Sequence, residues 1–254
     1  MKFPLLALLF LLILTPSLAD TFDSPFFELP LASDWQVSRS PAGLWSFERT
    51  EPFELSGSIL VNRLKTTPEM YLQGTLKLWE TQGRTEAQLH ENHLECMITP
   101  SQGEPIFKYV VWEDDLLLVA SFKFPVKHQD EALAMIRELA PGIVLHDPPF
   151  EPEALRAVVE HGLSTHQNTP EELSDASQIR TEMTSFRLDW EPYFKSSPPP
   201  LFTDFLEYLE ARYDAAFVAD HGEEMGMPAS LLESRLKAIQ NRRDEVEEVI
   251  RSER

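Results

Sequence analysis

Apolar and polar positions follow two different periods along this chain. Up to about residue 147, apolar residues alternate with polar ones, which is the pattern of half-buried strands. The alternation predicts strands over residues 44–49, 53–64, 85–99, 106–112 and 116–124. The last two flank Glu113-Asp114-Asp115 and therefore predict a hairpin.

Two helices separate these strands. Residues 68–82 predict one of them, because Thr67 is a good N-cap and Pro68 suits the first helical position. Residues 129–140 predict the other, which ends at Pro141-Gly142. The order is therefore ββ-α-βββ-α, with strands in blocks and helices apart from them. This order predicts an α+β fold in which helices pack on an antiparallel sheet.

Residues 148–254 have helical spacing and no strand pattern, so they predict an all-helical region. Helices are expected over 153–162, from Thr169, over 201–220 and from Pro228 onward. Apolar stripes on the last two predict an antiparallel pair. The stretch before this pair, residues 185–200, is rich in aromatic residues and proline and predicts a loop.

The first 19 residues have the three-part pattern of a secretory signal peptide. Lys2 supplies a basic start, an apolar run follows, and small residues precede an expected cut after Ala19. Pro16 interrupts the run before the roughly 20 residues that a membrane anchor needs. The sequence thus predicts a signal peptide (1–19), an α+β domain (20–147) and a helical region (148–254), in a periplasmic protein without a stable membrane anchor.

Charge narrows the choice of partner. The chain has 22 basic and 42 acidic residues, which gives a formal net charge of −20 at pH 7. This balance excludes a simple nucleic-acid binder, which carries a basic patch, and disfavours docking on an anionic membrane. The negative charge favours a basic protein as the partner, and we expect the free chain to be a monomer. The alternative explanation of the charge is that it keeps the protein soluble.

Motifs give no catalytic or cofactor site. The sequence contains no GxSxG, GxGxxG or GxxxxGK[ST] pattern, and its only cysteine, Cys96, is expected to be a buried hydrophobe. His90 and His93 are three apart in an apparent strand, so we expect them on opposite faces and not as metal ligands. We predict no enzyme, no cofactor and no metal site, with an unrecognised hydrolase as the alternative.

One segment has the composition of an interface. Residues 189–194 place three aromatic residues beside two acidic ones, and tryptophan and tyrosine are favoured interface anchors. We predict that a partner binds to Asp189, Trp190, Glu191, Tyr193 and Phe194. The alternative is that these aromatic side chains hold the loop on the core.

The opening FFELPLASDWQV, residues 26–37, resembles the start of PsbP-like and DcrB-like domains, which are small α/β/α sandwiches. The helix placement and the closing PGIVLHD, residues 141–147, are also similar, although Pro30 and Trp35 stand further apart than in that family. The resemblance covers about residues 21–147. It implies this fold and a non-enzymatic, often extracytoplasmic role, and it supplies no catalytic residues.

As a whole, the chain resembles the periplasmic immunity proteins that bacteria pair with toxic type VI secreted effectors, membrane-targeting phospholipases among them. The shared features are a cleaved signal, a small acidic two-part body and no catalytic set. This resemblance implies an inhibitor that occupies the active-site mouth of a toxin. The alternative is a general envelope accessory or stress factor on a DcrB-like scaffold.

Overall fold

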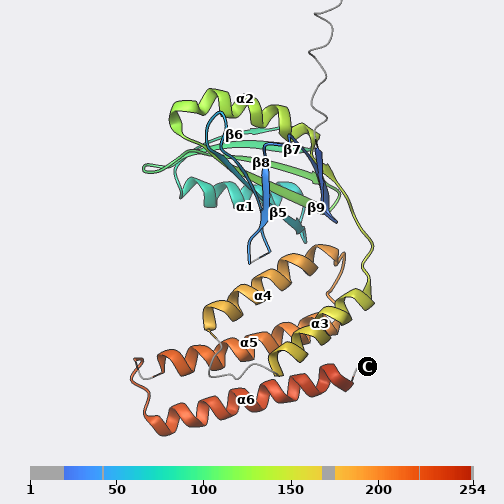
Figure 1. Cartoon of the computed structure of the whole chain (residues 1–254), viewed down its shortest axis with the longest axis vertical. Helices are drawn as coiled ribbons and strands as arrows, with labels where there is room; N and C mark the ends of the chain where they lie inside the picture. Colours follow the sequence, from blue (N-terminus) through green and yellow to red (C-terminus); the bar gives the residue numbers. More distant parts are fainter. Residues whose placement is uncertain (1–19, 42, 168–174, 223, 253–254) are drawn as a thin grey trace, which may run out of the picture.

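The computed structural model describes residues 20–252 apart from 42, 168–174 and 223 (Figure 1). The expected signal peptide and the expected helix start at Thr169 lie outside the described residues. Within them, strands occupy the first half and helices dominate the second. The α+β prediction is confirmed.

Two antiparallel sheets form the first half. The larger has the strand order β3-β4-β5-β9-β8-β7-β6. Its strands are β3 (Gln36–Arg39), β4 (Trp45–Arg49), β5 (Leu55–Arg63), β6 (Arg84–Leu89), β7 (His93–Thr99), β8 (Ile106–Glu113) and β9 (Leu116–Lys123). The smaller sheet has the order β1-β2-β10, from β1 (Asp20–Asp23), β2 (Phe27–Leu31) and β10 (Val144–Leu145).

Six α-helices and three short 3₁₀ segments are described. The α-helices are α1 (Pro68–Glu80), α2 (Gln129–Leu139), α3 (Pro152–Gln167), α4 (Ala176–Trp190), α5 (Pro200–His221) and α6 (Ala229–Ser252). The 3₁₀ segments are η1 (Val126–His128), η2 (Ala140–Gly142) and η4 (Glu191–Tyr193). Thr67 caps α1 as predicted, since its hydroxyl accepts from the amide of Met70 at 3.4 Å.

The centre of the larger sheet is buried on both faces, and β9, which lies there, is apolar at almost every position. Side chains alternate along this strand, so Leu117 packs with Trp79 of α1 and Leu118 packs with Ile136 of α2. Both leucines are completely buried. Burial on the two faces stabilises the strand at the centre of the domain.

The helices of the second half have their own apolar core, and in Figure 1 α4 lies nearest the sheet and α6 farthest from it. The predicted antiparallel pair is confirmed as α5 and α6, joined by an ion pair of Arg242 with Glu207 at 2.9 Å. No helix among the described residues is both long and apolar enough to cross a membrane.

Two expectations about the strands are wrong. Residues 85–99 are not one strand, because the chain reverses at residues 90–92 and forms the β6–β7 hairpin. The predicted element order also omits β1, β2, β3 and β10. These strands have five residues or fewer, which is too short for the alternation to stand out.

Candidate functional site

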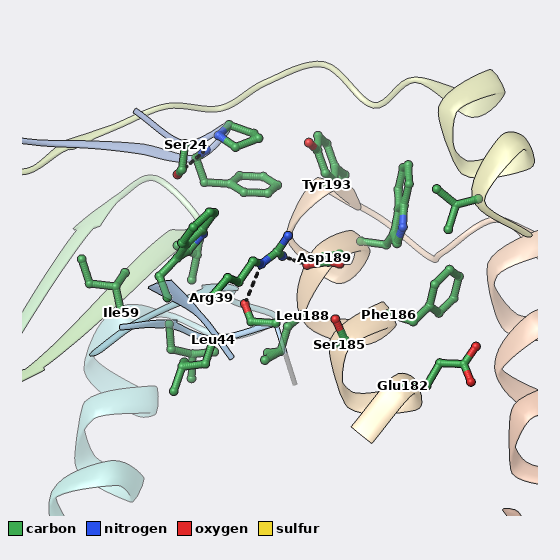
Figure 2. A pocket seen from close by; sticks show the side chains of 18 of the residues that line it. Ser24, Arg39, Leu44, Ile59, Glu182, Ser185, Phe186, Leu188, Asp189 and Tyr193 are labelled. Carbon is green, nitrogen blue, oxygen red and sulfur yellow. Dashed lines mark hydrogen bonds and ion pairs between the residues drawn. The ribbon is translucent and has the colours of Figure 1, made fainter. Parts of the chain in front are cut away.

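The predicted contact segment, residues 189–194, lies where the helical region meets the sheet, and we call it the junction segment (Figure 2). The expectation of a loop is wrong here, because Asp189 and Trp190 end α4 and Glu191–Tyr193 form η4. The helix reaches this point because residues 185–190 contain neither proline nor glycine. Pro192 then suits the first turn of η4.

The two acidic residues of the junction segment are already paired. Asp189 forms an ion pair with Arg39 of β3, which also donates to the carbonyl of Gly43 at 3.2 Å. Figure 2 shows Arg39 reaching across from the sheet to α4. Glu191 pairs with Arg187 one helical turn earlier at 2.9 Å, and both of these side chains are exposed. Asp189 therefore links the two halves, whereas Glu191 stays on the surface.

The three aromatic residues of the junction segment pack inward. Tyr193 meets Phe26 edge-on, with ring centroids 4.5 Å apart, and burial raises the pKa of its hydroxyl. Trp190 and Phe194 both pack on Phe150, with centroids 6.4 and 5.1 Å apart. The aromatic side chains thus hold the helical region in place. All three remain half-buried, and their role in partner binding stays a prediction.

A cavity of about 430 Å³ lies between the sheet and α4, next to the junction segment (Figure 2). The sheet side contributes Trp45 and Ile59, and the helical side contributes Phe186 and Leu188. The Arg39–Asp189 pair and Glu182 provide the charged part of its wall. The lining is therefore mainly apolar, with one ion pair across it.

Arg63, at the end of β5, is a residue that sequence reasoning missed. Its side chain is only 4% exposed and donates in three directions. It reaches the carbonyl of Pro192 at 2.7 Å, a carboxylate oxygen of Asp115 at 2.5 Å and one of Asp147 at 2.5 Å. One guanidinium thus connects the sheet, the β8–β9 turn, the linker after β10 and the junction segment. An arginine at the end of an apolar strand was its only signal in the sequence.

Beside Arg63 lies a hollow of about 380 Å³ that we call the acidic hollow. Its lining comprises Glu113, Asp114, Asp115, Leu116, Leu145, His146, Asp147 and Pro148. Asp114 has a φ of 51°, a left-handed conformation that aspartate tolerates and that turns the chain sharply at the rim. From the sequence, residues 113–115 were predicted only to form a hairpin turn, and Asp147 was seen only as the point where the helical region begins.

The carboxylates of the acidic hollow fall into two kinds. Asp147 accepts from Lys195 and Arg63, and these bonds lower the pKa of its carboxyl, so it stays ionised. Glu113 and Asp114 are exposed, and no ion pair joins them to any residue that the structure describes. The acidic hollow therefore combines carboxylates that are held by ion pairs with carboxylates that have no ion pair to any described residue.

The structure corrects the expectation for the two histidines. His90 and His93 do not point to opposite faces, because they lie on either side of a hairpin turn, and their rings stack with centroids 4.2 Å apart. Glu95 lies close to both.

Cys96 is completely buried as predicted, and burial raises the pKa of its thiol to about 11.

No protein-family model matches the chain, and no curated protein matches it. Among solved structures, the chain is similar to the solution structure of cyanobacterial PsbP (CyanoP) from Synechocystis sp. PCC 6803. The identity is 10% and the TM-score 0.38, over 50% of this chain and 92% of that one. It is also similar to a crystal structure from Bacteroides thetaiotaomicron VPI-5482, at 11% identity and a TM-score of 0.36, over 80% of this chain and 79% of that one. A PsbP protein is therefore among its structural neighbours, while membership of the PsbP-like and DcrB-like family stays a prediction.

Proposed function

We propose that this chain is an exported, non-enzymatic inhibitor that binds a basic protein, and that it acts as a periplasmic immunity protein against a type VI secreted antibacterial effector. The observation that carries the proposal is the acidic hollow. Glu113 and Asp114 line it as exposed residues without ion pairs to described residues, and Asp115 and Asp147 line the same hollow. A net charge of −20 adds long-range attraction for a basic partner.

The acidic hollow has the charge to receive a lysine or arginine side chain of the partner. Arg63 holds Asp115 and Asp147 in place, so these acceptors lose little side-chain freedom when a cation arrives. Once anchored there, the body of the inhibitor covers the mouth of the partner's active site and excludes its substrate. The exposed Glu191 of the junction segment offers a second acidic contact, next in sequence to Pro192, whose carbonyl accepts from Arg63.

A membrane-targeting phospholipase is the effector class to test first. Enzymes that act on anionic membranes use basic surfaces to reach them. A strongly acidic inhibitor is complementary to such a surface and competes with the membrane for it. The same complementarity speeds the encounter and makes it sensitive to salt.

The experiment uses the product of a toxin-like gene adjacent to the gene of this chain. Both proteins are directed to the periplasm of a susceptible bacterium, and survival is scored with and without the chain. The purified pair is then analysed by size-exclusion chromatography and by association kinetics at two salt concentrations. We expect restored survival, an equimolar complex and slower association at high salt.

Charge-reversal variants locate the contact. Glu113→Lys with Asp114→Lys should abolish protection, because two rim carboxylates become cations. The matched control is Glu245→Lys with Glu248→Lys, which makes the same charge change on exposed positions of α6. If the two pairs of substitutions have equal effects, binding depends on the net charge of the chain and not on the acidic hollow. Absence of both complex and protection would refute the proposal, and a deletion phenotype without any neighbouring toxin gene would favour the envelope accessory.

A further inference from the structure

We infer that the β6–β7 turn carries a binding site for a zinc-class divalent metal ion, formed by His90, His93 and Glu95. One ligand atom from each of these residues lies within 4.8 Å of the other two. Two imidazoles and one carboxylate form a donor set that suits zinc and its neighbours among the divalent transition metals. The site is independent of the acidic hollow and of the proposed inhibitor function.

The hairpin turn brings the two histidines together. The backbone amide of His90 donates to the carbonyl of His93 at 2.8 Å and closes the turn. The two rings then stack almost in parallel, with an interplanar angle of 7°. Nδ1 of His93 lies 3.2 Å from the side-chain oxygen of Asn92, so a proton on Nδ1 leaves Nε2 available as a ligand.

Glu95 completes the set because it lies two residues after His93 in β7, on the same face of the strand. This face is the one covered by α2, whose Arg137 binds the Glu95 carboxylate at 3.1 Å. The side chain of Glu95 is only 17% exposed, and Tyr109 lies opposite it in the strand register. Its position is therefore fixed by packing, while the exposed His90 is free to adjust.

Coordination requires a small rearrangement. Zinc bonds to nitrogen and oxygen are about 2.0–2.2 Å long, so tetrahedral ligand atoms lie roughly 3.4 Å apart. We infer that small side-chain rotations, the largest of them at the exposed His90, bring the three groups from their present separation to this one. Three protein ligands leave a fourth position for water, as in open zinc sites.

Arg137 is the competitor for this site. Its cation occupies the carboxylate that the metal needs, and it also repels the metal charge. Arg137 has a second contact, over the ring of Phe107 at 5.9 Å from the centroid, which does not depend on Glu95. Metal binding therefore exchanges one cation for another at Glu95, and removal of Arg137 should strengthen it.

The test titrates zinc chloride into the purified full chain by isothermal calorimetry at pH 7.5, and follows cobalt(II) chloride by its visible absorption. We expect one metal ion per chain. His90→Ala and His93→Ala should each weaken binding by at least about tenfold, as expected when a ligand is lost, and Glu95→Gln should also weaken it. Arg137→Gln should tighten it several-fold, an effect that a general loss of structure would not produce.

The control is His146→Ala. His146 belongs to a second group, with Asp23 and Glu28, whose ligand atoms meet the same 4.8 Å limit. We expect this variant to bind zinc like the unmodified chain. Absence of zinc binding, binding that survives both histidine substitutions in the turn, or binding that depends on His146 would each overturn the proposal. Far-UV circular dichroism and the urea midpoint of each variant separate a lost ligand from a lost fold.

Discussion

Replacing Arg63 by glutamine tests how the helical region is held on the sheet. The side chain is 4% exposed and donates to Pro192, Asp115 and Asp147, which belong to three different segments. Glutamine keeps part of the volume and one amide, but it loses the charge and the fork of donors. The change therefore removes most of the contact while disturbing the packing little.

The expected cost follows from burial. A hydrogen bond to a charged group contributes about 1.5–3 kcal/mol, and removing one partner of a buried ion pair costs about 3–5 kcal/mol. The side chains of Asp115 and Asp147 are 40% and 39% exposed, so water solvates them once Arg63 is gone. The low end of the range for a broken buried ion pair therefore applies, and we expect a loss of about 3 kcal/mol in the free energy of unfolding.

Urea unfolding followed by far-UV circular dichroism and by tryptophan fluorescence measures this loss. Arg84→Gln is the matched control, because Arg84 pairs with Glu86 at 2.8 Å but is 80% exposed. Surface pairs of this kind contribute about 0–1 kcal/mol. If both substitutions shift the midpoint equally, Arg63 does not hold the two halves together and the reasoning is refuted.

Substitutions at three further positions test the packing of the chain. The buried Cys96 thiol should react with a thiol reagent only when the chain unfolds. Folding raises the pKa of this thiol from 9.0 to about 11, so the free energy of unfolding should fall as the pH rises through this window. In a series of urea midpoints at increasing pH, Cys96→Ala should lack the part of this fall that the thiol causes. Tyr193→Ala should cost about 2 kcal/mol through loss of buried apolar area and of the ring contact with Phe26, whereas Tyr193→Phe should cost little, and equal urea midpoints for the two would contradict this. Gly162→Ala should destabilise by about 1–3 kcal/mol in thermal unfolding, because the new Cβ would lie 2.6 Å from the ring of the buried Phe205; an unchanged melting temperature would show that this ring can move.

Much of the fold could be predicted because long elements repeat their pattern often enough to be recognised. The apolar stripes of α5 and α6 extend over 22 and 24 residues, and the alternation of β5 extends over nine. In contrast, β10 has two residues and pairs with β2, where Val144 lies opposite Glu28. Nothing in the local sequence of either strand specifies a partner so far away along the chain.

The candidate sites were harder to predict for a related reason. The turn at residues 90–92 contains no glycine or proline, so the sequence predicted one continuous strand and placed His90 and His93 on opposite faces. Because the chain reversal at residues 90–92 was not predicted, the sequence did not indicate that His90, His93 and Glu95 lie close together. The aromatic residues of the junction segment were recognised as unusual, but Phe150, on which Trp190 and Phe194 pack, comes from a linker whose position only the tertiary fold determines.

Stability and partner binding are coupled at the acidic hollow, because Arg63 neutralises part of the charge that would attract a basic partner. Arg63 pairs with Asp115 and Asp147 in the folded chain, so its replacement by glutamine leaves both carboxylates without that cation. The less stable variant should therefore associate faster with a basic partner at low salt, and the gain should vanish at high salt, where screening removes it. Stopped-flow association kinetics with the cognate effector measure this effect. Slower association of Arg63→Gln at low salt, in a chain that is still folded, would show that the partner does not use these carboxylates.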